Sequence, residues 1–154
     1  MSPVIFEPIG LIHTPFKDPR KAPIQPRYAE GATGTVEVFA QYEEGLADLA
    51  GFSHIILLYH LHLSNGYSLK VVPYLDDTPR GLFATRAPHR PNPLGLSVVR
   101  LDKIEKNILY VTEVDMVDGS PLLDIKPYVP EFEKEDAVKI GWLQSKIRKE
   151  RKAD

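Results

Sequence analysis

The sequence predicts a small, mainly-β protein with a short C-terminal helix, and three observations lead to this expectation. The apolar stretches are short, the 14 prolines fall mostly in clusters between them, and only the last stretch has a helical period. Proline breaks helices and cannot donate a hydrogen bond inside a sheet, so many short strands with ordered loops are favoured over a helical bundle. A chain of 154 residues accommodates one such domain, and this pattern is typical of a small barrel or sandwich.

The first half of the chain should contain several short strands joined by loops. Residues 34–39 alternate polar and apolar side chains, which is the pattern of a strand with one buried face. Residues 55–63 begin as an apolar run, as a buried strand does, and end in alternation. The other elements expected here are a strand over 4–13 interrupted at Pro8, a proline-rich basic loop over 17–27, a short helix over 43–49, and short strands over 70–74 and 81–85.

The second half should contain a β-hairpin, a turn, one more strand and the terminal helix. Strands over 97–104 and 108–114 are expected to meet around 105–107, and the order Asp-Gly-Ser-Pro at 118–121 is a turn signal before a strand over 122–125. Residues 135–151 should be helical, because Ile140, Leu143 and Ile147 share one face and basic residues fill the last turns. We interpret residues 1–135 as the barrel and 136–154 as the C-terminal helix and basic tail of the same domain, with Trp142 as packing anchor.

Composition limits the functions that this chain can have. The formal net charge of -2 means that any nucleic-acid surface must be a local patch. The absence of cysteine rules out disulfides, zinc-thiolate sites and thiol catalysis. No signal peptide is visible, and the longest apolar run, 55–59, is too short to cross a bilayer, so we expect a cytoplasmic protein without a membrane partner. Neither a G-x-G-x-x-G nor a Walker A motif occurs, so a nucleotide-like cofactor would bind in an unusual way.

The segment 78–101 forms a concentrated positive field, because no acidic residue occurs between Asp77 and Asp102. Within it, Arg86 and Arg90 belong to a loop that three prolines stiffen. A stiff loop loses little entropy on binding, and arginine suits bidentate contact with a carboxylate or phosphate. The alternative is a structural loop whose arginines pair with acids elsewhere in the chain. The residue pattern alone leaves both interpretations open.

The loop sequence ATRAPHRPNPLGLS (84–97) resembles the signature of the TsaA-like (TrmO) family, from which it differs by Ala87 for serine and Leu94 for isoleucine. Three further segments resemble that family in the same order: IGLIHTPFK (9–17), GFSHIILLYHLH (51–62) and VDGSPLLDIKPYVP (117–130). The resemblance implies a single-sheet β-barrel that binds S-adenosyl-L-methionine, as a homodimer. It also implies N6-methylation of threonylcarbamoyladenosine next to the anticodon of tRNA.

The same resemblance implies where the cofactor binds. Arg86 is our candidate for the cofactor's carboxylate or ribose edge. The segment 112–115 should supply backbone carbonyls or a carboxylate near the ribose or the sulfonium. The full set of cofactor residues that the resemblance implies is Gln25, Pro26, Arg27, His62, Leu63, Arg86, Leu96, Thr112, Glu113, Val114 and Asp115.

The methyl acceptor requires a general base. N6 of threonylcarbamoyladenosine is a urea-type nitrogen with a delocalised lone pair, so its proton must leave as the new bond forms. Asp115, Asp118 and Asp124 are the nearby candidates in sequence, and we favour Asp115 or Asp118. For Asp118 there is a competing interpretation, because aspartate before glycine in a turn usually caps its own backbone.

Four side chains are candidates for the tRNA side. Arg90 and Lys126 could contact phosphates, and Arg90 could instead bind the carboxylate of the threonine moiety. Tyr128 could stack on a splayed base. Asn92, between two prolines, could contact tRNA or fix its own loop.

Two other functions stay open on the residues alone. A non-catalytic RNA-binding β-barrel would share the arginine patch without a cofactor pocket, and saturable binding of S-adenosyl-L-methionine would argue against it. A metal-dependent hydrolase would use His60 and His62, which at i and i+2 would share one face of a strand. Without a clear third ligand we expect no metal, and histidines that pack or hydrogen-bond beside the pocket.

Overall fold

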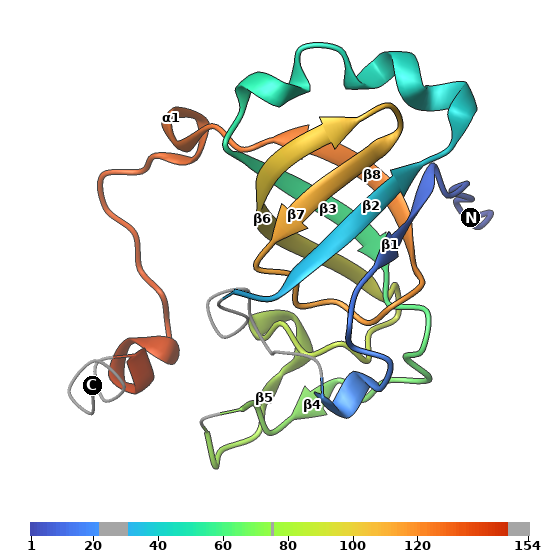
Figure 1. Ribbon diagram of the computed structural model, residues 1–154. Helices are drawn as coiled ribbons and strands as arrows, with labels where there is room; N and C mark the ends of the chain where they lie inside the picture. Colours follow the sequence, from blue (N-terminus) through green and yellow to red (C-terminus); the bar gives the residue numbers. More distant parts are fainter. Residues whose placement is uncertain (22–30, 75, 148–154) are drawn as a thin grey trace.

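A closed six-stranded barrel forms the body of the protein in the computed structural model, which describes residues 1–21, 31–74 and 76–147 (Figure 1). The strands follow the order β1-β2-β7-β6-β3-β8 around the barrel, and every neighbouring pair is antiparallel. The predicted mainly-β, single-sheet barrel is therefore confirmed. Its strands are β1 (Gly10–His13), β2 (Thr33–Val38), β3 (His54–His60), β6 (Leu94–Glu105), β7 (Ile108–Thr112) and β8 (Ser120–Pro127).

The barrel interior is apolar along most of its length, because alternate residues of each strand point inward. On β3, for example, Ile55, Leu57 and Tyr59 are buried while the residues between them are only partly covered. At the end of the barrel where β1 and β7 end and β8 begins, polar side chains join the buried set: Thr14, Ser97, Thr112 and Ser120. Polar groups inside a barrel need partners, so this end differs in chemistry from the rest of the core.

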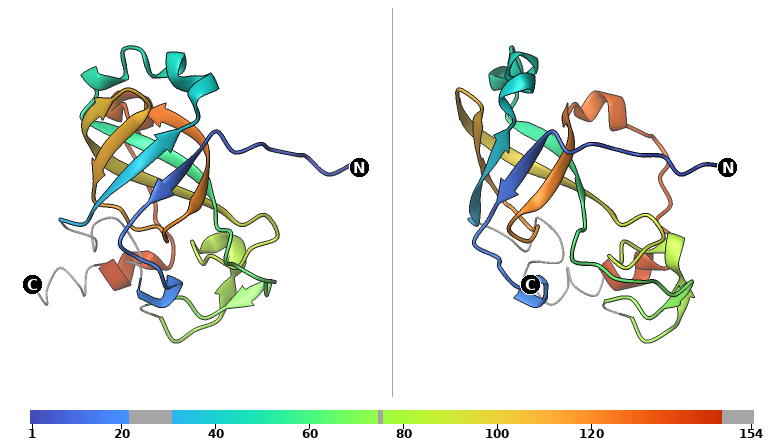
Figure 2. Two further views of the ribbon diagram at one scale, coloured as in Figure 1. Left: turned by 45° about the vertical axis from the view of Figure 1, so that its right-hand side comes forward. Right: turned by 90° about the vertical axis from the view of Figure 1, so that its right-hand side faces the viewer.

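The two ends of the barrel have different covers (Figures 1 and 2). The 3-10 helices η3 (Ala40–Leu46) and η4 (Leu49–Gly51) cross the upper end in Figure 1, close to the β6–β7 hairpin. At the lower end, η1 (Pro19–Lys21), the two-stranded sheet of β4 (Lys70–Val71) and β5 (Arg80–Gly81), and η5 (Leu82–Ala84) gather below the barrel. The signature segment 84–97 therefore starts in the lower unit and continues into β6.

Several of the expected strands and helices differ from the observed elements in their boundaries. The strand expected over 4–13 is confirmed only for 10–13, and residues 1–8 extend away from the barrel (Figure 2). The helix expected over 43–49 is two 3-10 segments, separated by Asp48 in a left-handed conformation with φ 68°. The strand expected over 81–85 stops at Gly81, because Leu82–Ala84 form a 3-10 turn that the Thr85 hydroxyl closes on the Leu82 carbonyl at 2.8 Å.

The C-terminal helix begins later than expected, and residues 148–151 of the expected range lie outside the described residues. The helix α1 (Pro130–Glu133) is followed by non-helical residues 134–140, and the second helix occupies 143–147 of the described chain, after Gly141 with φ 56°. Trp142 is an anchor, as predicted: its indole N–H donates to the Ala84 carbonyl at 2.9 Å, and the Arg80 guanidinium lies 5.4 Å from its ring centroid. None of the helices within the described ranges is long and apolar enough to span a membrane.

Candidate active site

Asp115 lies in the loop 113–119, which connects β7 to β8 at the lower end of the barrel. Glu113 adopts a left-handed conformation with φ 71°, and its N–H donates to the Ala32 carbonyl at 2.7 Å. The side chains of Val114 and Met116 enter the core with exposures of 0% and 3%. Asp115 lies between these two anchored residues, so its backbone position is fixed by packing on both sides.

Three side chains form a hydrogen-bonded chain from the core to Asp115. The Ser97 hydroxyl on β6 donates to Oδ1 of Asp115 at 2.6 Å, and Oη of Tyr59 on β3 lies 2.8 Å from Oγ of Ser97. Ser97 is 1% exposed and Tyr59 is 5% exposed. Asp115 was predicted from the sequence, but neither of its two partners was. A detectable signal exists, since a serine and a tyrosine occupy inward positions of otherwise apolar strands.

Burial raises the pKa of Asp115 from 3.8 to about 6. The Ser97 hydrogen bond, the backbone N–H of Asp115 and the positive charge of Arg86 act in the opposite direction and favour the carboxylate. Arg86 of the signature loop is thus close enough to act on Asp115, and the structure brings these two predicted residues together. A carboxylate with a pKa near 6 is ionised at neutral pH and is a stronger base than an ordinary aspartate.

Two other predicted cofactor residues, Leu63 and Leu96, lie after β3 and near the start of β6. Leu96 is 54% exposed on the outer face of β6, because its neighbours Gly95 and Ser97 take the inward positions. The N–H of Leu61 donates to the Pro93 carbonyl at 2.8 Å, which ties the segment after β3 to the signature loop. Leu63, which follows Leu61 by two residues, is 47% exposed.

His62 has a buried ring nitrogen for which the described residues provide no hydrogen-bond partner. Nδ1 of His62 is covered and, within the described part of the chain, makes no hydrogen bond. A buried polar atom of this kind is costly unless something binds it. The expected pairing of His60 and His62 on one strand face is wrong, because β3 ends at His60. Across residues 1–21, 31–74 and 76–147, no three His, Asp or Glu side chains gather as a metal site would need.

Arg90 and Asn92 hold the signature loop together. One amino nitrogen of Arg90, Nη1, donates to the carbonyls of Thr85 and Ala87, each at 3.0 Å, and the guanidinium lies 5.9 Å from the Phe83 ring centroid. The Asn92 carbonyl accepts a hydrogen bond from the N–H of Leu94 at 2.8 Å. These partners of Arg90 are carbonyls of its own loop and not the acidic residues that the structural alternative expected, and the bond at Asn92 involves only its main chain. The tRNA roles of both residues stay predictions.

Asp118 hydrogen-bonds to the loop that follows β1. Its carboxylate accepts hydrogen bonds from the N–H of Thr14, at 2.9 Å, and from Nζ of Lys17. The Lys17 ammonium is the main reason that the pKa of Asp118 is lowered. A lowered pKa makes Asp118 a weaker base than Asp115. Its carboxylate contacts the segment after β1 and not the backbone of its own turn, which differs from the capping role considered from sequence. Thr112 also has a structural partner, since its hydroxyl donates to Asp102 at 2.5 Å.

The remaining predicted residues are not brought to Asp115. The N–H of Tyr128 donates to the His54 carbonyl at 3.2 Å, and the two rings meet edge to face at 6.4 Å. His54 begins β3, and Tyr59 lies five positions farther, or about 17 Å along a strand. Lys126 pairs with Asp124 at 3.0 Å, also toward the upper part of β8. Gln25, Pro26 and Arg27 lie outside the described residues.

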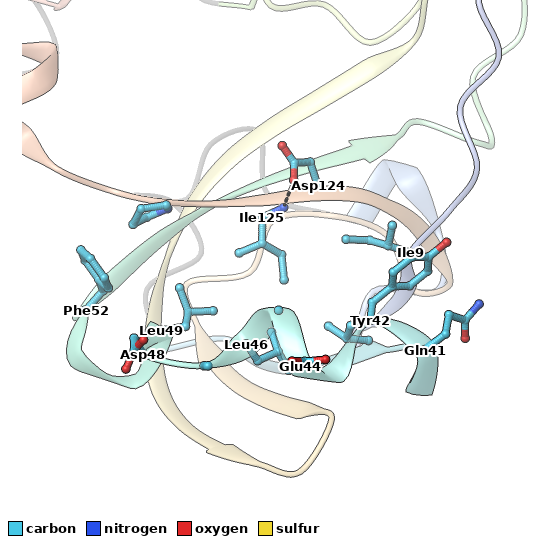
Figure 3. Close-up of a pocket in the computed structure, with 14 residues that line it drawn as sticks. Ile9, Gln41, Tyr42, Glu44, Leu46, Asp48, Leu49, Phe52, Asp124 and Ile125 are labelled. Carbon is cyan, nitrogen blue, oxygen red and sulfur yellow. Dashed lines mark hydrogen bonds between the residues drawn. The ribbon is translucent and has the colours of Figure 1, made fainter.

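An open hollow lies at the upper end, away from Asp115 (Figure 3). In Figure 3, Ile125 from β8 points toward Leu46 and Leu49 of the 3-10 segments, and Ile9 completes the apolar lining. Asp124 is at its rim and accepts a hydrogen bond from the N–H of Ile125 at 2.9 Å. The residues that line this hollow include none of the Tyr59–Ser97–Asp115 chain, so it belongs to the packing of the 3-10 segments on the barrel.

Comparisons with known proteins show which proteins this chain resembles. The family model described as the tRNA-methyltransferase O N-terminal domain matches residues 11–134. A probable S-adenosyl-L-methionine-binding protein of Pyrococcus abyssi is 53% identical over 150 residues, which cover 97% of this chain and 82% of that protein. A tRNA (adenine(37)-N6)-methyltransferase of Mus musculus is 35% identical over 159 residues, covering 98% of this chain and 37% of the mouse protein.

A solved structure has the same fold. The crystal structure of TrmO from Pseudomonas aeruginosa matches with a TM-score of 0.77 at 38% sequence identity. The match covers 91% of this chain and 62% of that chain. The present chain therefore spans less than two thirds of the length of the solved protein.

Proposed function

The chain belongs to the tRNA-methyltransferase O family, and we propose that it is an enzyme that transfers a methyl group from S-adenosyl-L-methionine to tRNA. The acceptor that we propose is N6 of threonylcarbamoyladenosine next to the anticodon. The names of the relatives support the cofactor and the adenine N6 position. The single observation that carries the chemistry is Asp115, a half-buried carboxyl whose pKa burial raises to about 6 and on which the charge of Arg86 acts.

The residues at the lower end fit S-adenosyl-L-methionine. When bound, this cofactor supplies an activated methyl group on a sulfonium. Arg86 offers a cation for the carboxylate of the cofactor, and Nδ1 of His62, to which no described residue hydrogen-bonds, offers a buried polar contact. Leu63 and Leu96 present exposed apolar surface on which an adenine ring can lie. The resemblance adds backbone carbonyls of the segment 112–115 to this set, together with Gln25, Pro26 and Arg27.

Asp115 is the general base of the proposed reaction. At neutral pH the carboxylate is mostly ionised, so it can accept the proton of N6 as the nitrogen forms its bond to the methyl carbon. Asp118 is less suited, since two donors occupy its carboxylate and Lys17 lowers its pKa. We therefore favour Asp115 over Asp118 and assign Asp118 to the folding of its loop.

We also propose a homodimer in the cytoplasm. Leu94 on the outer face of β6 is 50% exposed, and Phe83 nearby in the chain is 75% exposed. A contiguous patch of exposed apolar side chains is typical of an interface, and we propose that these residues form one. Sedimentation equilibrium of the protein, with Leu94→Asp as the disrupting variant, should give a dimer for the parent chain and a monomer for the variant.

Nucleoside mass spectrometry tests the proposed reaction directly. Protein, methyl-deuterated S-adenosyl-L-methionine and tRNA containing threonylcarbamoyladenosine are incubated, and the digested nucleosides are analysed. We expect a deuterated methyl group on that nucleoside, and its loss in Arg86→Ala. Lys103→Ala is the matched control, because Lys103 is a cation at the opposite end of the barrel that pairs with Glu105 at 3.1 Å.

The outcomes separate the candidate functions. Unmodified tRNA in the same assay shows whether the threonylcarbamoyl group is required. Cofactor binding without label transfer would point to another acceptor. If calorimetry detected no binding of S-adenosyl-L-methionine at all, the RNA-binding barrel would replace the enzyme as the best account.

A further inference from the structure

The hydrogen-bonded chain that ends at Asp115 begins deep in the barrel. Tyr59 comes from β3, Ser97 from β6 and Asp115 from the loop after β7, so three separate elements must be in place for it to form. Both hydroxyl groups are almost fully buried, with exposures of 5% for Tyr59 and 1% for Ser97. Burying two hydroxyl groups is costly unless each finds a partner, and here each is the other's partner.

The number of protons fixes the direction of the chain. Ser97 has one hydroxyl proton, and it is used in the hydrogen bond to Oδ1 of Asp115. The contact between Tyr59 and Ser97 must then be donated by Tyr59, because the only remaining proton is on its phenol. Burial raises the pKa of Tyr59, so the phenol keeps that proton at neutral pH. Both hydroxyl groups therefore point toward the Asp115 carboxylate.

Protonation of Asp115 disturbs this order. A carboxylic acid that donated to Ser97 would turn the Ser97 proton toward Oη of Tyr59, and the Tyr59 proton would then lose its acceptor. A buried donor without an acceptor is unfavourable. The chain thus favours the ionised form of Asp115, in opposition to the effect of burial on the same group. The charged and titratable groups that face Asp115 among the described residues are Arg86 and, through Ser97, Tyr59.

Two inward-facing residues of β6 contact Tyr59. Tyr59 is the register partner of Gly95, and a Cβ at that position would lie 2.8 Å from Cδ2 of the ring and closer still to Cε2 and Cζ. The ring therefore lies directly on the glycine backbone and reaches Ser97, two residues along the same face. Gly95 provides the space for the ring and Ser97 provides the acceptor, so both inward residues of the segment Gly95–Ser97 serve one tyrosine.

We propose that Tyr59 is a positioning residue that acts through Ser97 to hold Asp115 ionised and oriented for proton abstraction. This inference rests on the proposed function, in which Asp115 is the base. Tyr59 itself touches neither the cofactor nor the acceptor. Its contribution is to fix the direction of the Ser97 hydroxyl and thereby the orientation of the carboxylate.

Tyr59→Phe is the variant that tests this proposal, because it keeps the ring against Gly95 and removes only the hydroxyl. We expect the acidic limb of the profile of kcat against pH to move upward by about half a unit, and Ser97→Ala to move it farther, as losing about one hydrogen bond implies. KM for S-adenosyl-L-methionine should stay within about twofold, since binding is not the step affected. Tyr110→Phe is the control, since its hydroxyl bonds to Glu105 at the surface.

A double variant tests whether Tyr59 acts on Asp115 through Ser97, which we call the relay, or by a general effect on packing. If Tyr59 acts only through Ser97, then adding Tyr59→Phe to Ser97→Ala should produce no further shift of the profile. Additive shifts would overturn the proposal. Thermal unfolding of all variants shows that each is folded at the assay temperature.

Carboxyl NMR of Asp115 separates failure of this inference from failure of the proposed function. The pKa of Asp115 is measured in the parent protein and in both single variants, without any substrate. An unchanged pKa in Tyr59→Phe would overturn the relay even in an active enzyme. If the pKa of Asp115 were raised in Tyr59→Phe but the parent protein had no methyltransferase activity, the effect of Tyr59 on Asp115 would be supported and the proposed reaction would not.

Discussion

The ring of Tyr59 on β3 lies against the backbone of Gly95 on β6, so closely that a Cβ on Gly95 would be 2.8 Å or less from three carbons of the ring. Gly95 is buried and paired in register with Tyr59, so neither residue can move away without opening the β3–β6 ladder. An aromatic ring packed over a glycine in the neighbouring strand is a way of filling the space that the glycine leaves.

Gly95→Ala should therefore destabilise the fold. The added methyl group displaces either the Tyr59 ring or the β6 backbone, and we expect a loss of about 1–3 kcal/mol in the free energy of unfolding. Urea unfolding measures it. Gly45→Ala is the matched control, because nothing lies within 4 Å of the place that a Cβ on Gly45 would occupy and its φ is not positive. Equal stability of the two variants would contradict the close approach.

Asp115→Asn should remove most of the methyltransferase activity. The amide keeps an acceptor for Ser97 but cannot take a proton, so kcat should fall by about 10²-fold or more. Asp118→Asn should act mainly on stability, because it weakens the pairing with Lys17 and leaves Asp115 in place. Single-turnover methylation of tRNA gives the rates. A larger loss of kcat in Asp118→Asn than in Asp115→Asn would reverse the assignment.

The raised pKa of Asp115 predicts the direction in which the stability of the protein changes with pH. Its pKa is higher in the folded protein, about 6, than the ordinary value of 3.8, so the folded state binds the proton more tightly. Protonated Asp115 therefore adds to the free energy of unfolding. This stabilising contribution is fully present below pH 3.8 and is lost as the pH rises through about 6. Asp115→Asn, which cannot ionise, should thus be more stable than the parent protein by about 1–3 kcal/mol at pH 7.5.

Thermal unfolding of both proteins at about pH 4.5 and about pH 7.5 checks this sign. Comparison with the parent protein at each pH removes the effect of other groups such as Asp118, whose pKa is lowered and whose contribution has the opposite pH dependence. Asp115→Asn should unfold at only a slightly higher temperature than the parent protein at the acidic pH, and at a clearly higher temperature at the alkaline pH. An advantage that did not depend on pH would mean that burial does not raise the pKa of Asp115.

Trp142 should control the attachment of the C-terminal helix. Trp142→Phe keeps a ring beside Arg80 but removes the N–H that bonds to the Ala84 carbonyl. We expect faster amide exchange in 142–147 and in 82–84, measured by mass spectrometry, because a hydrogen bond between the two segments is lost. Phe132→Ala, at a residue that is 81% exposed, is the control and should leave both segments unchanged.

Elements that depend on local pattern could be predicted from the sequence alone. The alternation over 34–39, the hairpin around 105–107 and the turn before β8 were all predicted, since a strand period and a turn preference are properties of neighbouring residues. The resemblance of four segments identified the family and named Arg86 and Asp115. The helix expected over 135–151 failed in its first part, because a helical period in sequence does not ensure a surface to pack on: residues 134–140 are exposed.

Assembly of the site, in contrast, depends on the tertiary structure. The partners of Asp115 come from β3 and β6, and their meeting depends on the pairing register of two strands and on closure of the barrel. The same closure separates Tyr128 from Asp115, although the two are only 13 positions apart, because β8 carries the chain to the opposite end. A sequence states which side chains are present; the register of strands distant in the chain decides which of them meet, and that register is set by the packing of the whole core.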